Sequence, residues 1–176
     1  MFNVLSQYSH GKVAWFLLLI STVIFESTAL YFQHGLKLQP CSLCIYQRCA
    51  LFGILFASII GLFFSKYTIF RFGAIVLWIY SAVSGFLLAY QQARLQFEPT
   101  FADSCSLYPD FPTWLPLHEW FPAVFDATGS CAAKLWSFLT IEMSQWMIII
   151  FACYIIVALL VLISQLFSPK RRSIWQ

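Results

Sequence analysis

Four apolar stretches, each about as long as a helix that crosses a bilayer, constrain the fold of this chain more than any other feature. A helix needs about 20 mostly apolar residues to span the hydrocarbon core of a membrane. Hydrophobic residues make up 61% of the chain and charged residues only 10%, which excludes an ordinary soluble protein. The small net charge of +3 gives no reason to expect a nucleic-acid partner. The predicted spans are residues 13–32, 44–64, 72–89 and 145–167.

The links between these stretches predict how the helices are arranged. Residues 33–43 and 65–71 are short, and short links join antiparallel neighbours. We therefore expect an all-α membrane protein with one domain, residues 1–176, folded as an up-down bundle of four transmembrane helices. Residues 90–144 form a long loop in which apolar positions 114, 117, 121 and 124 have helical spacing. This spacing predicts a short helix, lying in the lipid interface or in a small core over the end of the bundle.

The distribution of lysine and arginine predicts the orientation in the membrane. Cytoplasmic segments of membrane proteins carry more of these residues than segments on the other side. The two termini and the 65–71 turn share one side and carry six of them, whereas the 33–43 and 90–144 loops carry three. We expect cytoplasmic termini and, in a bacterium, periplasmic loops. Since no small-residue cleavage site follows the first span, it is expected to remain as an anchor and not to be removed as a signal peptide.

Four of the six cysteines fall on the expected periplasmic side. Cys41 and Cys44 form a C-x-x-C motif at the start of the second span, and Cys105 and Cys131 lie in the long loop. Disulfides form and persist in such an oxidising compartment. Pairing 41 with 44 and 105 with 131 is simplest, but four cysteines allow three connectivities and the sequence does not choose among them. The cysteines expected only to fill space inside apolar spans are Cys49 and Cys153.

The two pairs differ in what a disulfide would do. A 105–131 disulfide closes a proline-broken loop and can stabilise it by a few kcal/mol. A 41–44 disulfide restrains almost nothing beyond the helix end, whereas thiols at a helix N-terminus favour a reactive thiolate. Zinc is a weaker alternative because 25 residues, not two, separate the second pair, and we expect no metal. A c-type haem would need histidine where Ile45 stands.

Two charged residues are expected within the spans. Arg48 lies four residues after Cys44, on the same helix face and about 6 Å further along the axis. An arginine inside the hydrocarbon is a candidate functional residue, here for the Cys44 thiolate or an anionic reduced ligand, although it can also snorkel to the headgroups. Glu26 lies at a comparable depth in the first span, and we expect it to form an ion pair with Arg48.

The two cysteine pairs together indicate a relay of electrons. A thiolate of a partner attacks the loop disulfide, and exchange passes the reducing equivalents to the 41–44 pair. Since the sequence has no haem, flavin or nucleotide motif, a lipid-soluble quinone is the expected oxidant of that pair. The alternatives are a non-catalytic membrane protein whose disulfides hold a partner-docking loop, and a quinone-linked thiol enzyme of the vitamin K epoxide reductase type.

Several strings of the sequence resemble one family. Residues 39–53, QPCSLCIYQRCALFG, the loop cysteines, the WLPL string at 114–117 and the basic tail are similar to the DsbB family of Gram-negative inner membranes. The likeness keeps order and spacing over essentially the whole chain. It implies a quinone-dependent protein-disulfide oxidoreductase that reoxidises DsbA, a periplasmic dithiol oxidase of thioredoxin fold. The electrons would pass to ubiquinone, or to menaquinone without oxygen.

The resemblance also implies roles by position. Cys105 would form the mixed disulfide with DsbA, and Cys131 would be its loop partner. Cys41 would exchange with the loop pair, and Cys44 would be the thiolate that meets the quinone. Arg48 matches the family arginine beside the quinone.

One position departs from the family pattern. Close relatives often have histidine in a Tyr-Glu-His context near the outer end of the third span, where this chain has Tyr90-Gln91-Gln92. Gln92 can hydrogen-bond a quinone oxygen, but it cannot carry a proton as imidazole does. With glutamine at this position, the sequence offers no obvious residue to deliver a proton to the quinone here.

Overall fold

The computed structural model describes residues 12–97, 120–125, 129–131, 137–138 and 140–166. Its long helices are α2 (Lys12–His34), α3 (Ser42–Phe64), α4 (Thr68–Phe97) and α7 (Met143–Leu166). Each of these four helices is long and apolar enough to cross a membrane. The predicted fold class, a bundle of four transmembrane helices, is therefore confirmed.

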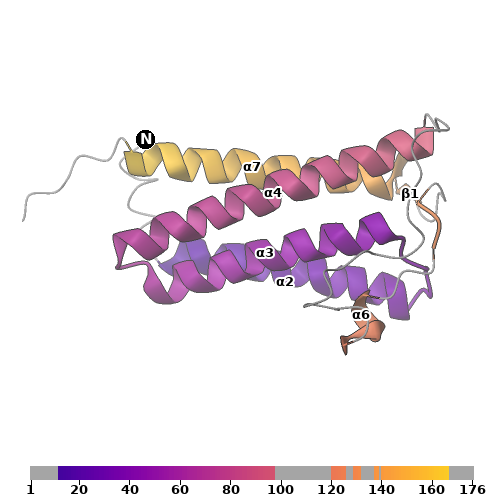
Figure 1. The fold of residues 1–176 in the computed structure, drawn as a ribbon, viewed down its shortest axis with the longest axis horizontal. Helices are drawn as coiled ribbons and strands as arrows, with labels where there is room; N and C mark the ends of the chain where they lie inside the picture. The colour runs from indigo at the N-terminus through magenta and orange to yellow at the C-terminus, as the bar shows by residue number, and fades with distance from the viewer. Residues whose placement is uncertain (1–11, 98–119, 126–128, 132–136, 139, 167–176) are drawn as a thin grey trace, which may run out of the picture.

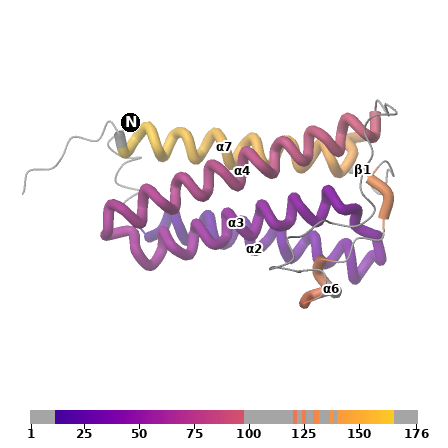
Figure 2. The backbone as a smooth tube through the Cα atoms, in the orientation of Figure 1, coloured from indigo at the N-terminus to yellow at the C-terminus, as the bar shows by residue number. Residues whose placement is uncertain are grey.

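The four long helices run side by side, and successive helices point in opposite directions (Figure 1, Figure 2). α3 packs against both α2 and α4, and α4 also packs against α7. α2 begins and α7 ends at one end of the bundle, where the tight turn between α3 and α4 also lies. We call this end the termini end and the opposite end, where α3 begins, the loop end.

Close packing of side chains holds the helices together. Trp15 of α2 and Trp78 of α4 meet edge to face, with ring centroids 6.2 Å apart. Gly85 of α4 allows the ring of Phe151 on α7 to approach the helix backbone, and a Cβ at this glycine would clash with that ring. Lipid tails are as apolar as the side chains, so helix association in a membrane depends on such close contacts.

α4 is longer than the apolar stretch that predicts it. The sequence predicts that the third span ends at Ala89 and that a loop follows, but the helix continues to Phe97. Residues 90–97 contain no proline or glycine, and the buried side chains of Gln92 and Leu95 face the start of α3. These tertiary contacts extend the helix beyond the predicted end of the span. The other three long helices match their predicted bounds within two residues.

The described parts of the long loop contain the short helix α6 (Pro122–Phe125) and a hairpin of β1 (Ser137–Phe138) and β2 (Ile141–Glu142). The short helix was expected, although positions 114 and 117 of its predicted face lie outside the described residues. The two strands are antiparallel and pair Ser137 with Glu142 and Phe138 with Ile141. The sequence did not predict this hairpin, because the residues between its strands are not of the Asn-Gly type that signals a tight turn.

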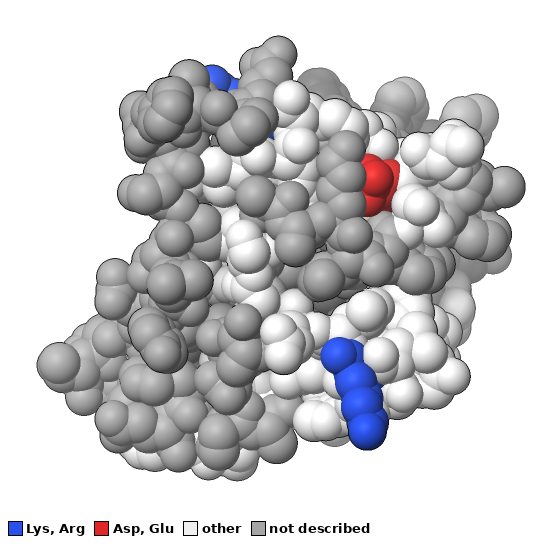
Figure 3. All heavy atoms as spheres, turned by 90° about the vertical axis from the view of Figure 1, so that its right-hand side faces the viewer, with Lys and Arg blue, Asp and Glu red and all other residues white. Residues whose placement is uncertain are grey.

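The loop end carries little charge among its described residues. Figure 3 looks onto this end and shows charged side chains in only a few places on the described surface. Trp120 and Phe121, just before α6, are 57% and 58% exposed. Exposed aromatic side chains of this kind suit the interface between lipid and water, which is one of the two placements that the sequence predicts for this segment.

Candidate functional site

Cys41 and Cys44 form a pair of sulfurs at the start of α3. Cys41 is the N-cap residue, with φ −89° and ψ 169°, and its sulfur accepts a hydrogen bond from the backbone N–H of Cys44 at 3.4 Å. The two sulfurs lie 2.8 Å apart and are thiols. The predicted disulfide, whose sulfurs would be about 2.05 Å apart, is therefore not formed in this structure. The two sulfurs are in contact without a bond, and a small movement would bring them to bonding distance.

The two sulfurs differ in their surroundings. Cys41 is 1% exposed, and its hydrogen bond with Cys44 together with burial raises the pKa of the Cys41 thiol. Cys44 is only partly buried and lines a cavity between the helices. The sulfur that a bound molecule can reach is that of Cys44.

Two buried glutamines lie beside the sulfur pair. The amide nitrogen of Gln92 on α4 donates to the sulfur of Cys44 at 3.3 Å and to that of Cys41 at 3.6 Å. The amide oxygen of Gln92 accepts a hydrogen bond of 2.7 Å from the amide nitrogen of Gln47 on α3. The predicted site residue Gln92 thus lies at the site, and its observed partners are the two sulfurs and Gln47.

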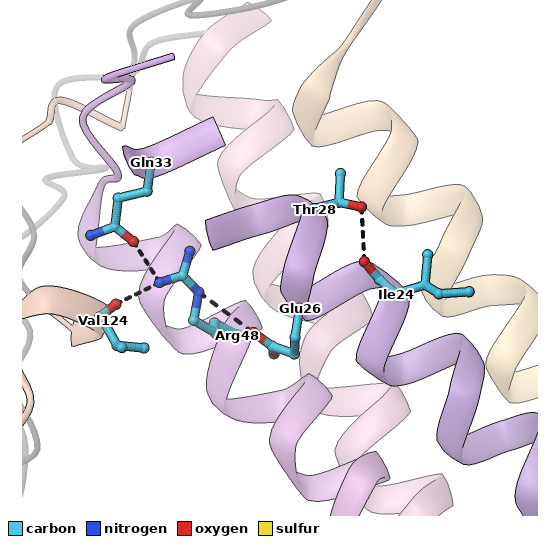
Figure 4. A network of polar contacts seen from close by, with 6 residues as sticks. All are labelled: Ile24, Glu26, Thr28, Gln33, Arg48 and Val124. Carbon is cyan, nitrogen blue, oxygen red and sulfur yellow. Dashed lines mark hydrogen bonds and ion pairs between the residues drawn. The ribbon is translucent and has the colours of Figure 1, made fainter. Parts of the chain in front are cut away.

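Next to the sulfur pair, Arg48 of α3 contacts both α2 and α6 (Figure 4). Its guanidinium donates hydrogen bonds to the side-chain oxygen of Gln33 in α2, at 2.7 Å, and to the backbone carbonyl of Val124 in α6. Its Nε lies 3.7 Å from a carboxylate oxygen of Glu26, which confirms the predicted ion pair. Arg48 is 6% exposed, so it does not snorkel toward the headgroups.

A cavity of about 260 Å³ opens beside Cys44 between the helices. Its walls are mostly apolar and include a few polar side chains, as in typical small-molecule sites. The polar side chains in its lining include those of Gln33, Cys44, Gln47, Arg48 and Gln92.

A second cavity, of about 520 Å³, lies further toward the termini end, where residues of α2 and α7 form most of its lining. This larger cavity is almost wholly apolar. It shares Phe25, Trp146 and Ile150 with the cavity beside Cys44. The two cavities therefore share part of their walls and lie one after the other along the bundle, starting from the sulfur pair.

Cys131 of the long loop lies beside the sulfur pair. It is 2% exposed and belongs to the same buried cluster as Cys41. Its sulfur lies 3.6 Å from the hydroxyl of Ser42. Cys131 is disulfide-bonded, and Cys105, its predicted partner, lies outside the described residues. The structure thus brings Cys131 and Cys41, which are far apart in sequence, to one place.

Two contacts hold the loop against α3. The backbone N–H of Gly129 donates to the carbonyl of Pro40 at 3.0 Å, immediately before the C-x-x-C motif. Phe125 of α6 is buried beside Ile45 and lies with its ring centroid 6.0 Å from that of Phe52. These contacts, with the Arg48 hydrogen bond to α6, position the loop over the start of α3.

Part of this site is not predicted from the sequence. Gln33 and Gln47 were not singled out, although Gln47 lies three residues after Cys44 and so shares its helix face.

Cys49 and Cys153, expected to fill space, are thiols at partly buried and exposed positions. Within the described ranges, no group of three His, Cys, Asp or Glu side chains could hold a metal ion.

Comparison with known proteins identifies the family. The family model of the disulfide bond formation protein DsbB matches residues 11–161 of this chain. The chain belongs to the DsbB family. Among DsbB-family relatives, the disulfide bond formation protein B of Photorhabdus laumondii is 51% identical over 97% of this chain and 100% of its own length. The proteins of that name from Yersinia enterocolitica and Salmonella typhimurium are 49% and 47% identical, each over 99% of both chains.

Membership of the DsbB family confirms the resemblance seen in the sequence. It also makes the chain a disulfide bond formation protein with thiol oxidoreductase activity. The sulfur pair on α3 and the loop cysteine beside it are the groups in the described structure that suit this chemistry.

Proposed function

We propose that this DsbB-family protein oxidises a periplasmic dithiol protein of the DsbA type and passes the two electrons to a membrane quinone. One observation carries the proposal: a disulfide-bonded loop cysteine, a C-x-x-C thiol pair and a cavity meet at the loop end. Disulfide exchange needs sulfurs in contact, and electron transfer to a ligand needs one sulfur open to it. The arrangement supplies both.

Exchange moves two electrons from the partner to the Cys41–Cys44 pair. A partner thiolate attacks Cys105, and the sulfur of Cys131 leaves as a thiolate. Cys131 then attacks Cys41 of the oxidised pair, which forms a 41–131 disulfide and releases Cys44. The partner's second thiolate displaces Cys105, so the partner departs as a disulfide. Cys105 finally attacks Cys131, re-forms the loop disulfide and leaves Cys41 and Cys44 reduced.

The volume and the mostly apolar lining of the cavity beside Cys44 support a quinone head group as its ligand. When bound, ubiquinone or menaquinone would accept two electrons and two protons from the thiol pair, which becomes a disulfide. Arg48 places a positive charge near Cys44 and is fixed by Glu26 and Gln33, so it can stabilise negative charge on the sulfur or on a bound ligand. The adjoining apolar cavity of about 520 Å³ suits a polyprenyl chain.

The proposal includes an orientation in the membrane. The loop end faces the periplasm of a Gram-negative inner membrane, because most of the lysine and arginine outside the spans lies at the termini and in the 65–71 turn. In this orientation the sulfur pair lies where a periplasmic partner and a membrane quinone can both reach it.

The test uses membranes containing the protein, reduced DsbA and a soluble ubiquinone analogue. Quinone loss is followed by absorbance and free thiols are counted, with an expected ratio of one quinone to two partner thiols. Cys41→Ser should stop quinone loss while Cys105 can still be trapped on the partner, and Cys49→Ser serves as the matched control. Quinone loss that continues in Cys41→Ser, or none in the wild type, would leave only the non-catalytic docking protein.

A further inference from the structure

We propose that the side-chain amide of Gln92, held in orientation by Gln47, is the hydrogen-bond donor that stabilises the thiolate of Cys44. This inference rests on the proposed function and assigns Gln92 to the sulfurs and Gln47 to a positioning role. Three of the four hydrogen-bonding positions of the Gln92 amide are used in these contacts, since both N–H groups face the sulfurs and the oxygen accepts from Gln47.

The hydrogen bond from Gln47 decides which end of the Gln92 amide faces sulfur. If the Gln92 amide alone were turned over while Gln47 kept its orientation, its nitrogen would meet the amide nitrogen of Gln47, and two donors would oppose one another. Both side chains are buried, so water cannot readily take the place of the lost hydrogen bond. A buried polar group left unpaired is costly, and this cost keeps the nitrogen of Gln92 on the sulfurs.

A donor at this position matters because the surroundings are apolar. A thiolate is costly in such a place unless donors or charges compensate it. The nearby cation, Arg48, is already engaged by Glu26, Gln33 and the carbonyl of Val124. The amide of Gln92 adds a neutral donor at 3.3 Å from the sulfur of Cys44.

The placement of the two glutamines on different helices makes the contact rigid. Gln47 lies one turn after Cys44 on α3, and Gln92 lies in the part of α4 that extends beyond the predicted span. The two helices pack against one another along the bundle. The contact therefore needs no loop movement to form.

The test measures the thiolate without quinone or partner. Fully reduced, full-length protein in detergent micelles is treated with iodoacetamide at pH 7, and the alkylation rate of each cysteine is read by mass spectrometry. Loss of a hydrogen bond to a charged group costs enough free energy that Gln92→Leu should slow alkylation of Cys44 about tenfold. Gln47→Leu should slow it less, because the amide of Gln92 remains but is free to turn.

Internal and matched controls separate this effect from loosening of the fold. Cys49 on the same helix should keep its rate, whereas loosening would speed alkylation at both positions. Gln96→Leu removes a glutamine one turn further along α4 that accepts from Ser144, and it should leave Cys44 unchanged. Gln92→Glu keeps the size but removes the donor, so it should slow Cys44 at least as much as Gln92→Leu.

Unchanged or faster alkylation of Cys44 in Gln92→Leu and Gln92→Glu would overturn the inference. This outcome is distinct from failure of the proposed function. A protein that shows the Cys44 effect but does not reduce quinone contradicts only the proposed function. A protein that reduces quinone but shows no Cys44 effect contradicts only the role of Gln92.

Discussion

The charge of Arg48 is balanced and held inside the protein. Glu26 lies 3.7 Å from its Nε, and Gln33 and the carbonyl of Val124 accept two hydrogen bonds from its guanidinium. Removing one partner of a buried pair leaves an uncompensated charge, which costs more than the pair itself contributes. Arg48 therefore fixes α2 and the α6 segment against α3 as well as placing charge near Cys44.

We expect Arg48→Met and Glu26→Gln to destabilise the protein. Arg48→Met leaves the Glu26 carboxylate buried and unpaired, which should lower the free energy of unfolding by about 3–5 kcal/mol. Glu26→Gln should have a comparable effect, measured by thermal or denaturant unfolding in detergent micelles. Exchanging the two residues should restore part of the loss, whereas independent and additive effects would contradict the pairing.

The sequence predicts individual site residues where a residue type is rare at its position. Cysteines at C-x-x-C spacing and single charges inside apolar spans stand out in the sequence, and the structure brings Cys41, Cys44 and Arg48 together. The contact between Gln47 and Gln92 depends on how α4 is rotated against α3, which local sequence does not encode. The hydrogen bond from Arg48 to Val124 could not be predicted, because it uses a backbone carbonyl, which every residue has.

Contacts between the long helices rely on small residues at a few crossings. A Cβ at Gly85 of α4 would meet the ring of Phe151 on α7, whereas a Cβ at Gly73 on the same helix has open space around it.

Apolar content was enough to predict that four helices exist. It could not predict the extension of α4 to Phe97, because residues 90–97 are largely polar and are held by contacts with α3.

The pair Gly85→Ala and Gly73→Ala tests this packing. Both changes should gain about 1 kcal/mol of helix propensity. Gly85→Ala should lose more than that gain, since overpacking of a core costs about 1–3 kcal/mol, so it should lower the unfolding temperature in detergent micelles. Gly73→Ala should leave that temperature unchanged or raise it. Equal behaviour of the two variants would show that the contact with Phe151 does not limit how closely α4 and α7 approach.

The bundle and the loop together place three kinds of group at one end of the protein. α3 presents the thiol pair, the loop presents Cys131, and the cavity between the helices opens beside Cys44. The larger apolar cavity, lined mostly by α2 and α7, lies further along the bundle from this end. The proposed cycle follows from this arrangement, since a water-soluble partner and a lipid-soluble acceptor would approach the same sulfurs from different sides.

A single-turnover measurement tests whether the thiol pair reduces a quinone. Fully reduced protein, free of partner and oxygen, is mixed with one equivalent of a soluble ubiquinone analogue. Quinone absorbance is recorded, and the cysteines are mapped by mass spectrometry after alkylation. We predict that one quinone is consumed for each disulfide formed, whether it is found at Cys41–Cys44 or, after exchange, at the loop cysteines. Quinone that persists while Cys41 and Cys44 remain open to alkylation would contradict the proposed function.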